Sequence, residues 1–258
     1  MAFGTQAFTL GAMLLVACDA STGAATRDTP PRENATPSAS AAPTKPARYL
    51  ERVTGGANPH ESLPLVVALH GLGDTPEAFG ELYAGFDGKA RILLLGAPDA
   101  FGGGYSWFPF RPEASDEERA REISRAAERL APMLPSLAAA RPTRGKPILT
   151  GFSQGGMLSF AIAARHPELV ACALPIGGVL PEALWPPLDP KVRHPRIVAL
   201  HGEDDTRVPI APTRAGITAL TARGYDARLE AFPGVGHQIP AAMRARYFEL
   251  LHEAIGAS

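Results

Sequence analysis

The serine at position 153 has the surroundings that most clearly predict chemistry. It is the central residue of Gly-Phe-Ser-Gln-Gly (151–155), between an apolar, strand-like run (147–150) and a helix-like stretch (157–164). Glycines at a strand-to-helix turn permit a strained bend that holds a serine hydroxyl above a sheet. Free N–H groups at the helix N-terminus stabilise the oxyanion of acyl transfer, so the pattern predicts a nucleophile. The alternative is a serine that only caps the helix.

A serine nucleophile needs a general base and a carboxylate that orients the base. Three consecutive acids, Glu203, Asp204 and Asp205, follow a strand-like run (196–200), and His237 lies in a loop after a later one. The chain between these positions leaves room for about one βα unit each time, as a parallel sheet requires. Spacing alone does not choose among the three acids.

The other histidines are predicted to be structural. His70 and His201 each precede a glycine at a strand end, where a histidine more often packs and hydrogen-bonds locally than catalyses. His166 is expected to end a helix, and His252 lies in an amphipathic C-terminal helix. His237 follows the candidate acids and lies on a loop, so it is the predicted base.

Four motifs together resemble the phospholipase/carboxylesterase family of α/β-hydrolases, which includes acyl-protein thioesterases. They are Leu-His-Gly-Leu-Gly-Asp-Thr (69–75), Gly-Phe-Ser-Gln-Gly-Gly (151–156), His-Gly-Glu-Asp-Asp-Thr-Arg-Val-Pro (201–209) and Gly-His (236–237). The resemblance covers roughly residues 62 to 255. In this family the triad acid lies four residues before the proline of an Asp-x-x-Val-Pro run, which implies Asp205. It also implies that neither a metal nor an organic cofactor is needed.

The same resemblance implies an oxyanion hole and a substrate pocket. The oxyanion donors would be the backbone N–H groups of Leu72 and Gln154. The segment 102–110 resembles a family loop that carries a Trp-Phe pair beside the active site, so Trp107 and Phe108 are expected to line an acyl or aromatic pocket. The alternative is that both pack in the core. The three consecutive glycines and the aromatic cluster depart from the family's usual pattern here, so the resemblance does not by itself imply a specificity for long acyl chains.

Strand-like runs alternate with helix-like stretches along the chain. This order predicts an α/β-hydrolase fold with a mostly parallel central sheet, helices on both faces and no large lid. A capping box from Ser115 to Glu118 predicts the start of a long helix that extends to Leu130, near Pro132 and Pro135. The expected strands are 65–69, 91–95, 147–150, 170–176, 196–200 and 227–232.

The N-terminal region reads differently from the rest of the chain. Residues 7–17 are apolar but shorter than the roughly 20 residues that span a bilayer, so they predict a signal peptide (1–18). The signal ends in Leu-Val-Ala-Cys, which resembles a bacterial lipobox and implies lipidation at Cys18. Residues 19–47 are rich in Ala, Pro, Ser and Thr and predict a disordered tether before the catalytic domain (48–258). No Lys or Arg precedes the apolar run, so a cytoplasmic enzyme with a disordered leader is the alternative.

These observations predict a serine carboxylic-ester hydrolase, a carboxylesterase or thioesterase that acts through an acyl-enzyme on a small ester or thioester. We expect it in the cell envelope, anchored to a bacterial membrane through a lipid on Cys18. An extracellular polysaccharide-acyl or feruloyl-type esterase is an alternative, because acylated cytosolic proteins would be out of reach. A surface lipoprotein that keeps the hydrolase fold only for binding is the alternative of another class. The net charge of −1 and the lack of a basic cluster argue against nucleic acid as a partner.

Overall fold

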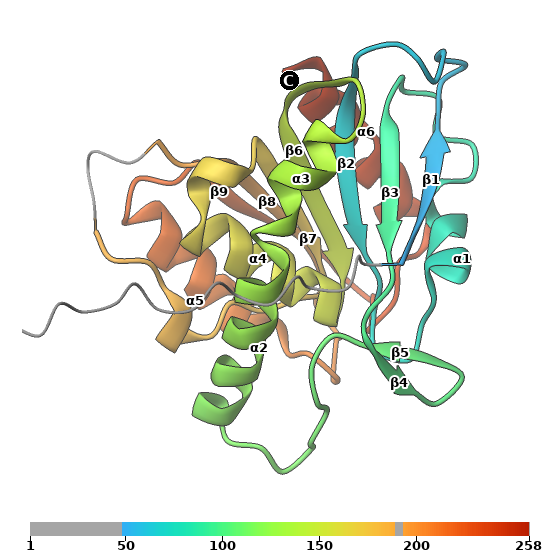
Figure 1. The fold of residues 1–258 in the computed structure, drawn as a ribbon. Coiled ribbons are helices and arrows are strands. Elements are labelled where there is room, and N and C mark those ends of the chain that lie inside the picture. The colour runs from blue at the N-terminus through green and yellow to red at the C-terminus, as the bar shows by residue number, and fades with distance from the viewer. Residues whose placement is uncertain (1–47, 189–192, 258) are drawn as a thin grey trace, which may run out of the picture. The chain divides into compact units, whose positions relative to one another are not determined.

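The computed structural model describes residues 48–188 and 193–257, so the predicted signal segment, Cys18 and most of the chain before β1 lie outside the described residues. Seven strands form one sheet in the order β1-β3-β2-β6-β7-β8-β9 (Figure 1). Strand β1 pairs antiparallel with β3, and every other neighbouring pair is parallel. The strands are β1 (Tyr49–Val53), β2 (Leu63–Leu69), β3 (Arg91–Leu95), β6 (Thr143–Phe152), β7 (Cys172–Ile176), β8 (Arg196–Gly202) and β9 (Ala227–Phe232).

Helices cover both faces of this sheet. In Figure 1, α2, α3 and α4 lie in front of the strands and α6 lies behind them. The α-helices are α1 (Pro76–Phe79), α2 (Asp116–Leu130), α3 (Met133–Ala139), α4 (Gln154–Arg165), α5 (Ile210–Thr221) and α6 (Ala241–Gly256). Short 3-10 turns are η1 (Gly80–Tyr83), η2 (Pro167–Leu169) and η3 (Glu182–Leu184). Within the described ranges, no helix combines the length and the apolar character that a membrane span needs.

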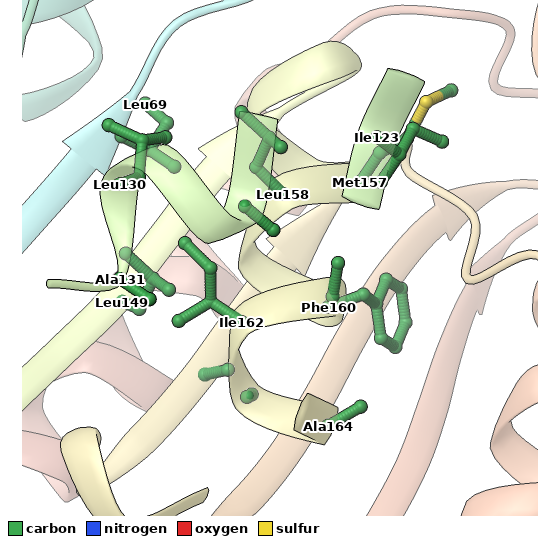
Figure 2. Close-up of a cluster of buried hydrophobic side chains, with 14 of the residues drawn as sticks. Leu69, Ile123, Leu130, Ala131, Leu149, Met157, Leu158, Phe160, Ile162 and Ala164 are labelled. Carbon is green, nitrogen blue, oxygen red and sulfur yellow. The ribbon is translucent and has the colours of Figure 1, made fainter. Parts of the chain in front are cut away.

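Two hydrophobic cores result, one on each face, because strands buried on both sides present alternate side chains to opposite layers. The first core includes Leu69 and Leu149 of the sheet, Ile123 of α2 and Leu158 of α4, which are among the buried side chains drawn in Figure 2. In the second core, the alternate strand residues pack against η1 and α6. Tyr247 is one of the buried residues that α6 contributes. Helix α4 is buried along nearly its whole length, which fixes its N-terminus firmly against the sheet.

The six predicted strands and the mostly parallel sheet are confirmed. The predicted capping box is also present: the Ser115 hydroxyl accepts from the Glu118 N–H, and the Glu118 carboxylate accepts from the Ser115 N–H. Helix α2 ends at Leu130 and α3 starts after Pro132, as the prolines indicate. The sequence did not predict the edge strand β1 or the small hairpin formed by β4 (Asp99–Phe101) and β5 (Gly104–Ser106).

The carboxyl ends of the parallel strands determine where polar loops gather. Strands β2, β6, β8 and β9 end at Leu69, Phe152, Gly202 and Phe232, and each is followed within a few residues by a candidate site residue. Ligands of open α/β sheets bind at this edge of the sheet. The fold therefore brings four loops, distant in sequence, to one place.

Candidate active site

Ser153 lies on a strained turn between β6 and α4. Its backbone has φ of 55° and ψ of −115°, and it is the only non-glycine residue with positive φ in the described ranges. This conformation is costly for a residue with a Cβ and persists only where the surrounding structure enforces it. The Ser153 N–H donates to the carbonyl of Ile176 at 2.9 Å, and the Ser153 carbonyl accepts from Met157 in α4. The neighbouring strand and the helix thus hold the turn from both sides.

The glycines that flank the serine are required by close backbone contact. A Cβ at Gly155 would lie 2.0 Å from the carbonyl oxygen of Leu69, and one at Gly151 would lie 2.5 Å from the backbone of Gly155. No real Cβ tolerates these distances without backbone movement. The close packing of β2, β6 and the first turn of α4 therefore depends on both glycines.

The structure brings Ser153, His237 and Asp205 into one hydrogen-bonded chain. His237 Nδ1 lies 2.6 Å from Asp205 Oδ2, and His237 Nε2 lies 2.9 Å from Ser153 Oγ. A carboxylate only accepts, so Nδ1–H donates to Asp205 and Nε2 is left to accept the serine O–H. This tautomer is the one that a general base for Ser153 needs.

The loop after β8 distinguishes the three consecutive acids. Asp205 is 5% exposed, and its Oδ1 accepts from the N–H groups of Arg207 and Val208 at 3.0 and 2.9 Å. Glu203 is exposed and forms an ion pair with Arg214 at 2.6 Å, and the Asp204 side chain is also exposed. Only Asp205 of the three reaches His237, so the structure places the acid where the resemblance implied it.

The imidazole of His237 is held by packing as well as by hydrogen bonds. The ring of Phe152, the last residue of β6, lies with its centroid 4.7 Å from that of His237 at an angle of 31°. The His237 side chain is 9% exposed, so one edge still faces the cleft. Aromatic packing of this kind restricts rotation of the ring while both nitrogens keep their partners.

A second buried histidine, His201, contacts the triad acid, a contact that the sequence does not predict. His201 Nε2 lies 2.8 Å from the Val208 carbonyl and 3.4 Å from Asp205 Oδ2. Its Nδ1 is 3.2 Å from the hydroxyl of Thr213, which also contacts the Gly178 carbonyl. Burial lowers the pKa of His201 from its ordinary value, and this outweighs the opposite effect of Asp205. His201 is therefore a neutral donor that supports the turn at 205–208.

The two predicted oxyanion donors lie beside the serine. Gln154 is the first residue of α4, where backbone N–H groups have no acceptor within the helix. Leu72 lies in the turn after β2, and both residues line the same cleft as Ser153 and His237. In the described residues the Leu72 N–H has no acceptor within the protein. Both N–H groups are thus free to bind an oxyanion.

Both residues of the predicted Trp-Phe pair are buried in the hydrophobic core, Trp107 at 2% and Phe108 at 5% exposure. Phe108 also lines the cleft but Trp107 does not, so the prediction that Trp107 lines the pocket is wrong. The physical reason is that the Trp107 indole N–H donates to the His70 carbonyl at 2.8 Å, which turns the ring inward. The side chain of Gln154, also buried, accepts from the Trp107 backbone N–H at 3.0 Å.

These residues open onto a cleft of about 1450 Å³. Part of its wall is apolar and includes Leu72, Phe108, Met157 and Trp185, and another part carries the acidic first turns of α2. An apolar cleft with a few convergent polar groups is typical of a small-molecule site. Among the residues that the structure describes, no three His, Cys, Asp or Glu side chains are grouped to hold a metal ion.

Comparison with known proteins gives one family. A family model described as phospholipase/carboxylesterase matches residues 50–251. An acyl-protein thioesterase 1 from Gibberella zeae is 30% identical over 101 residues, a stretch that covers 35% of this chain and 40% of the relative. A probable inactive carboxylesterase from Oryza sativa subsp. japonica is 28% identical over 201 residues, which cover 72% of this chain and 80% of the relative.

The fold is also similar to that of solved structures. The crystal structure of esterase PE8 matches with a TM-score of 0.69 and 25% identity, over 81% of this chain and 99% of the other. The match to the thioesterase relative spans less than half of that protein, whereas the match to the solved esterase spans nearly all of it.

Proposed function

Because the chain belongs to the phospholipase/carboxylesterase family of α/β-hydrolases, we propose that it is a serine hydrolase of carboxylic esters or thioesters. The observation that carries the proposal is the continuous hydrogen-bonded chain from Ser153 through His237 to Asp205, open to the cleft. One relative is named a probable inactive carboxylesterase, so family membership alone is a weak argument for activity. The intact chain of three side chains in this protein is the stronger one.

The proposed reaction proceeds through an acyl-enzyme. Ser153 Oγ attacks the substrate carbonyl while its proton passes to His237 Nε2, and the N–H groups of Leu72 and Gln154 bind the oxyanion. The C–O or C–S bond then breaks, and His237 returns the proton to the leaving alcohol or thiol. A water molecule, deprotonated by His237, attacks the acyl-Ser153 ester, and His237 returns this proton to Ser153 Oγ as the acid leaves. Asp205 keeps the imidazole in the required tautomer throughout.

Replacement of the nucleophile tests this proposal. Ser153→Ala is expected to fold normally but to lose essentially all hydrolysis of p-nitrophenyl esters and all labelling by a serine-reactive fluorophosphonate. Ser159→Ala is the matched control, because Ser159 is a buried serine of the adjoining helix α4 whose hydroxyl donates to the Gly155 carbonyl. This control is expected to keep its labelling. Full turnover by Ser153→Ala would remove Ser153 from the mechanism, and a wild-type protein with neither turnover nor labelling would support a non-catalytic binding role.

A feruloyl-type or other aromatic-acyl esterase is a second candidate, favoured by one feature of the cleft. Phe101 and Phe110 line it and are 41% and 55% exposed, and their rings meet edge to face at 6.4 Å. Exposed aromatic side chains offer apolar surface at a small entropic cost and suit an aromatic acyl group. Hydrolysis rates for p-nitrophenyl esters of increasing chain length, with thioester and feruloyl substrates in parallel, separate the two candidates.

We also propose that the protein is a lipoprotein of the cell envelope, anchored through Cys18. The support is the sequence: an apolar segment ends in Leu-Val-Ala-Cys and precedes a polar stretch rich in Ala, Pro, Ser and Thr. In a bacterial host, radiolabelled palmitate is expected in the wild-type protein and not in Cys18→Ser. If neither protein is labelled, the anchor is wrong and the cytoplasmic alternative gains support.

A further inference from the structure

The two oxyanion donors of the proposed reaction belong to separate parts of the chain. Leu72 lies in the turn after β2, and Gln154 starts α4. A tetrahedral oxyanion needs both N–H groups within hydrogen-bonding distance at once, and a shift of about 1 Å in such a site can cost roughly 100-fold in rate. Something must therefore fix the distance between the two segments.

Trp107 makes hydrogen bonds to both segments. Its indole Nε1–H donates to the carbonyl of His70 at 2.8 Å, two residues before Leu72. Its backbone N–H donates to the side-chain oxygen of Gln154 at 3.0 Å. Trp107 is 2% exposed and Gln154 is 4% exposed, so water does not compete for either bond.

The segment around Leu72 is held on both sides of the donor. Before it, His70 Nδ1 is 2.7 Å from the Gly71 carbonyl and His70 Nε2 accepts from the Ala97 N–H at 3.1 Å. The His70 ring also packs against the Trp107 ring, with centroids 5.2 Å apart. After it, Gly73 donates to the carbonyl of Tyr105, two residues before the tryptophan, at 2.8 Å. Strand β5 and Trp107 thus hold this turn through backbone and indole hydrogen bonds and through the contact between the two rings.

The Gln154 amide completes the connection. Its Nε2 donates to the Phe108 carbonyl at 3.0 Å while its Oε1 accepts from the Trp107 N–H. The amide nitrogen and the amide oxygen thus bond to two consecutive residues, Phe108 and Trp107, which fixes the Gln154 side chain. The backbone N–H of Gln154 is the second oxyanion donor. Any buried indole N–H needs a partner, but here that partner is in the turn that carries Leu72, while the backbone N–H of the same tryptophan bonds to the side chain of Gln154.

We propose that Trp107 and the side chain of Gln154 form a bridge that sets the spacing of the Leu72 and Gln154 N–H donors, so both are positioning residues of the oxyanion hole. This inference rests on the proposed function. The bridge consists of two hydrogen bonds. The Trp107 indole N–H donates to the His70 carbonyl, and the Trp107 backbone N–H donates to the side-chain oxygen of Gln154. It predicts that weakening the bridge harms the transition state more than the binding of substrate.

Trp107→Phe tests the bridge, because it keeps a six-membered aromatic ring in the core and removes the five-membered ring that carries the indole N–H. We expect kcat to fall about 10- to 100-fold and KM to change less than about twofold. Binding of phenylboronic acid is expected to weaken by a similar factor. Ser153 Oγ forms a bond to the boron of this inhibitor as the serine proton passes to His237, and the resulting tetrahedral boronate anion places one of its hydroxyl groups in the oxyanion hole.

Tyr225→Phe is the matched control. The buried Tyr225 hydroxyl donates to the backbone carbonyl of Ala164 at 2.9 Å, so this variant also loses one buried hydrogen bond to a carbonyl and keeps its ring. It lies outside the cleft and is expected to lose thermal stability with unchanged kcat and boronic-acid affinity. If Trp107→Phe behaves like this control, the tryptophan is only structural and the inference is overturned.

Gln154→Met provides a second test if Trp107→Phe folds poorly. It keeps the backbone N–H donor and the length of the side chain but removes both amide bonds. We expect the same pattern, with lower kcat, weaker boronic-acid binding and little change in KM; unchanged kcat would overturn the bridge. Failure of the proposed function is a separate result, because the wild-type protein itself would then show neither turnover nor boronic-acid binding.

Discussion

Asp205 accepts a hydrogen bond from His237 at 2.6 Å while its second oxygen is held by two backbone N–H groups of its own loop. The carboxylate is thus fixed at both oxygens before any substrate binds. Asp204, its neighbour in the same run of acids, projects outward and is exposed. The position of a single residue in this loop decides which acid reaches the histidine.

Asp205→Asn is expected to lower kcat by about 10³- to 10⁴-fold with little change in folding. The amide still accepts from the Arg207 and Val208 N–H groups, but its NH2 then faces His237 Nδ1. The imidazole must accept there and carry its proton on Nε2, where it no longer accepts from Ser153. Steady-state hydrolysis of p-nitrophenyl acetate measures the loss. Asp204→Asn changes the same residue type one position away, and a comparable loss in that variant would contradict the assignment of Asp205.

The sequence predicts the central strands well because residues buried on both faces form near-continuous apolar runs. The edge strand β1 has no such run, since it alternates exposed and half-buried residues, and its pairing depends on β3. Strands β4 and β5 have three residues each, which is too short for a periodic signal. These segments are defined by their partners in space and not by their own composition.

The candidate site divides in the same way. Ser153 and His237 follow from a local motif and from chain order, while Asp205 needed the family pattern because three adjacent acids share one loop. The sequence does not show that Trp107 points into the core, because a sequence pattern does not tell which way an aromatic side chain points. Its direction depends on the carbonyl of His70, which is far away in sequence. The contact of His201 with Asp205 was missed for the same reason.

Gly155→Ala is expected to destabilise the protein severely, by about 3 kcal/mol or more, or to prevent folding. The new Cβ would lie 2.0 Å from the Leu69 carbonyl oxygen and 2.8 Å from that of His70. Both are backbone atoms of a buried strand end, so neither moves aside cheaply. Urea unfolding followed by circular dichroism measures the change in the free energy of unfolding.

Gly103→Ala is the control for the glycine substitution. A Cβ at Gly103, in the exposed turn between β4 and β5, meets nothing within 4 Å. Its effect on the free energy of unfolding is expected to stay within about 0.5 kcal/mol, as for other surface positions. Equal losses in the two variants would contradict the argument from close backbone contact.

The stability of the fold is expected to depend on pH through His201. Burial lowers the pKa of this histidine in the folded state below its ordinary value of 6.5; His237 acts in the same direction, whereas the Val208 carbonyl and Asp205 oppose it. Below about pH 6.5 the unfolded chain therefore binds a proton that the folded protein does not, and the free energy of unfolding falls as the pH decreases.

His201→Gln removes this titration, so its loss of stability between pH 7.5 and 5.0 should be smaller than that of the wild type. Some dependence is expected to remain, because burial lowers the pKa of His70 as well. Urea unfolding at both pH values measures the difference, with His60→Gln as the control at an exposed position. Equal pH dependence in the wild type and in His201→Gln would show that His201 takes up its proton alike in both states.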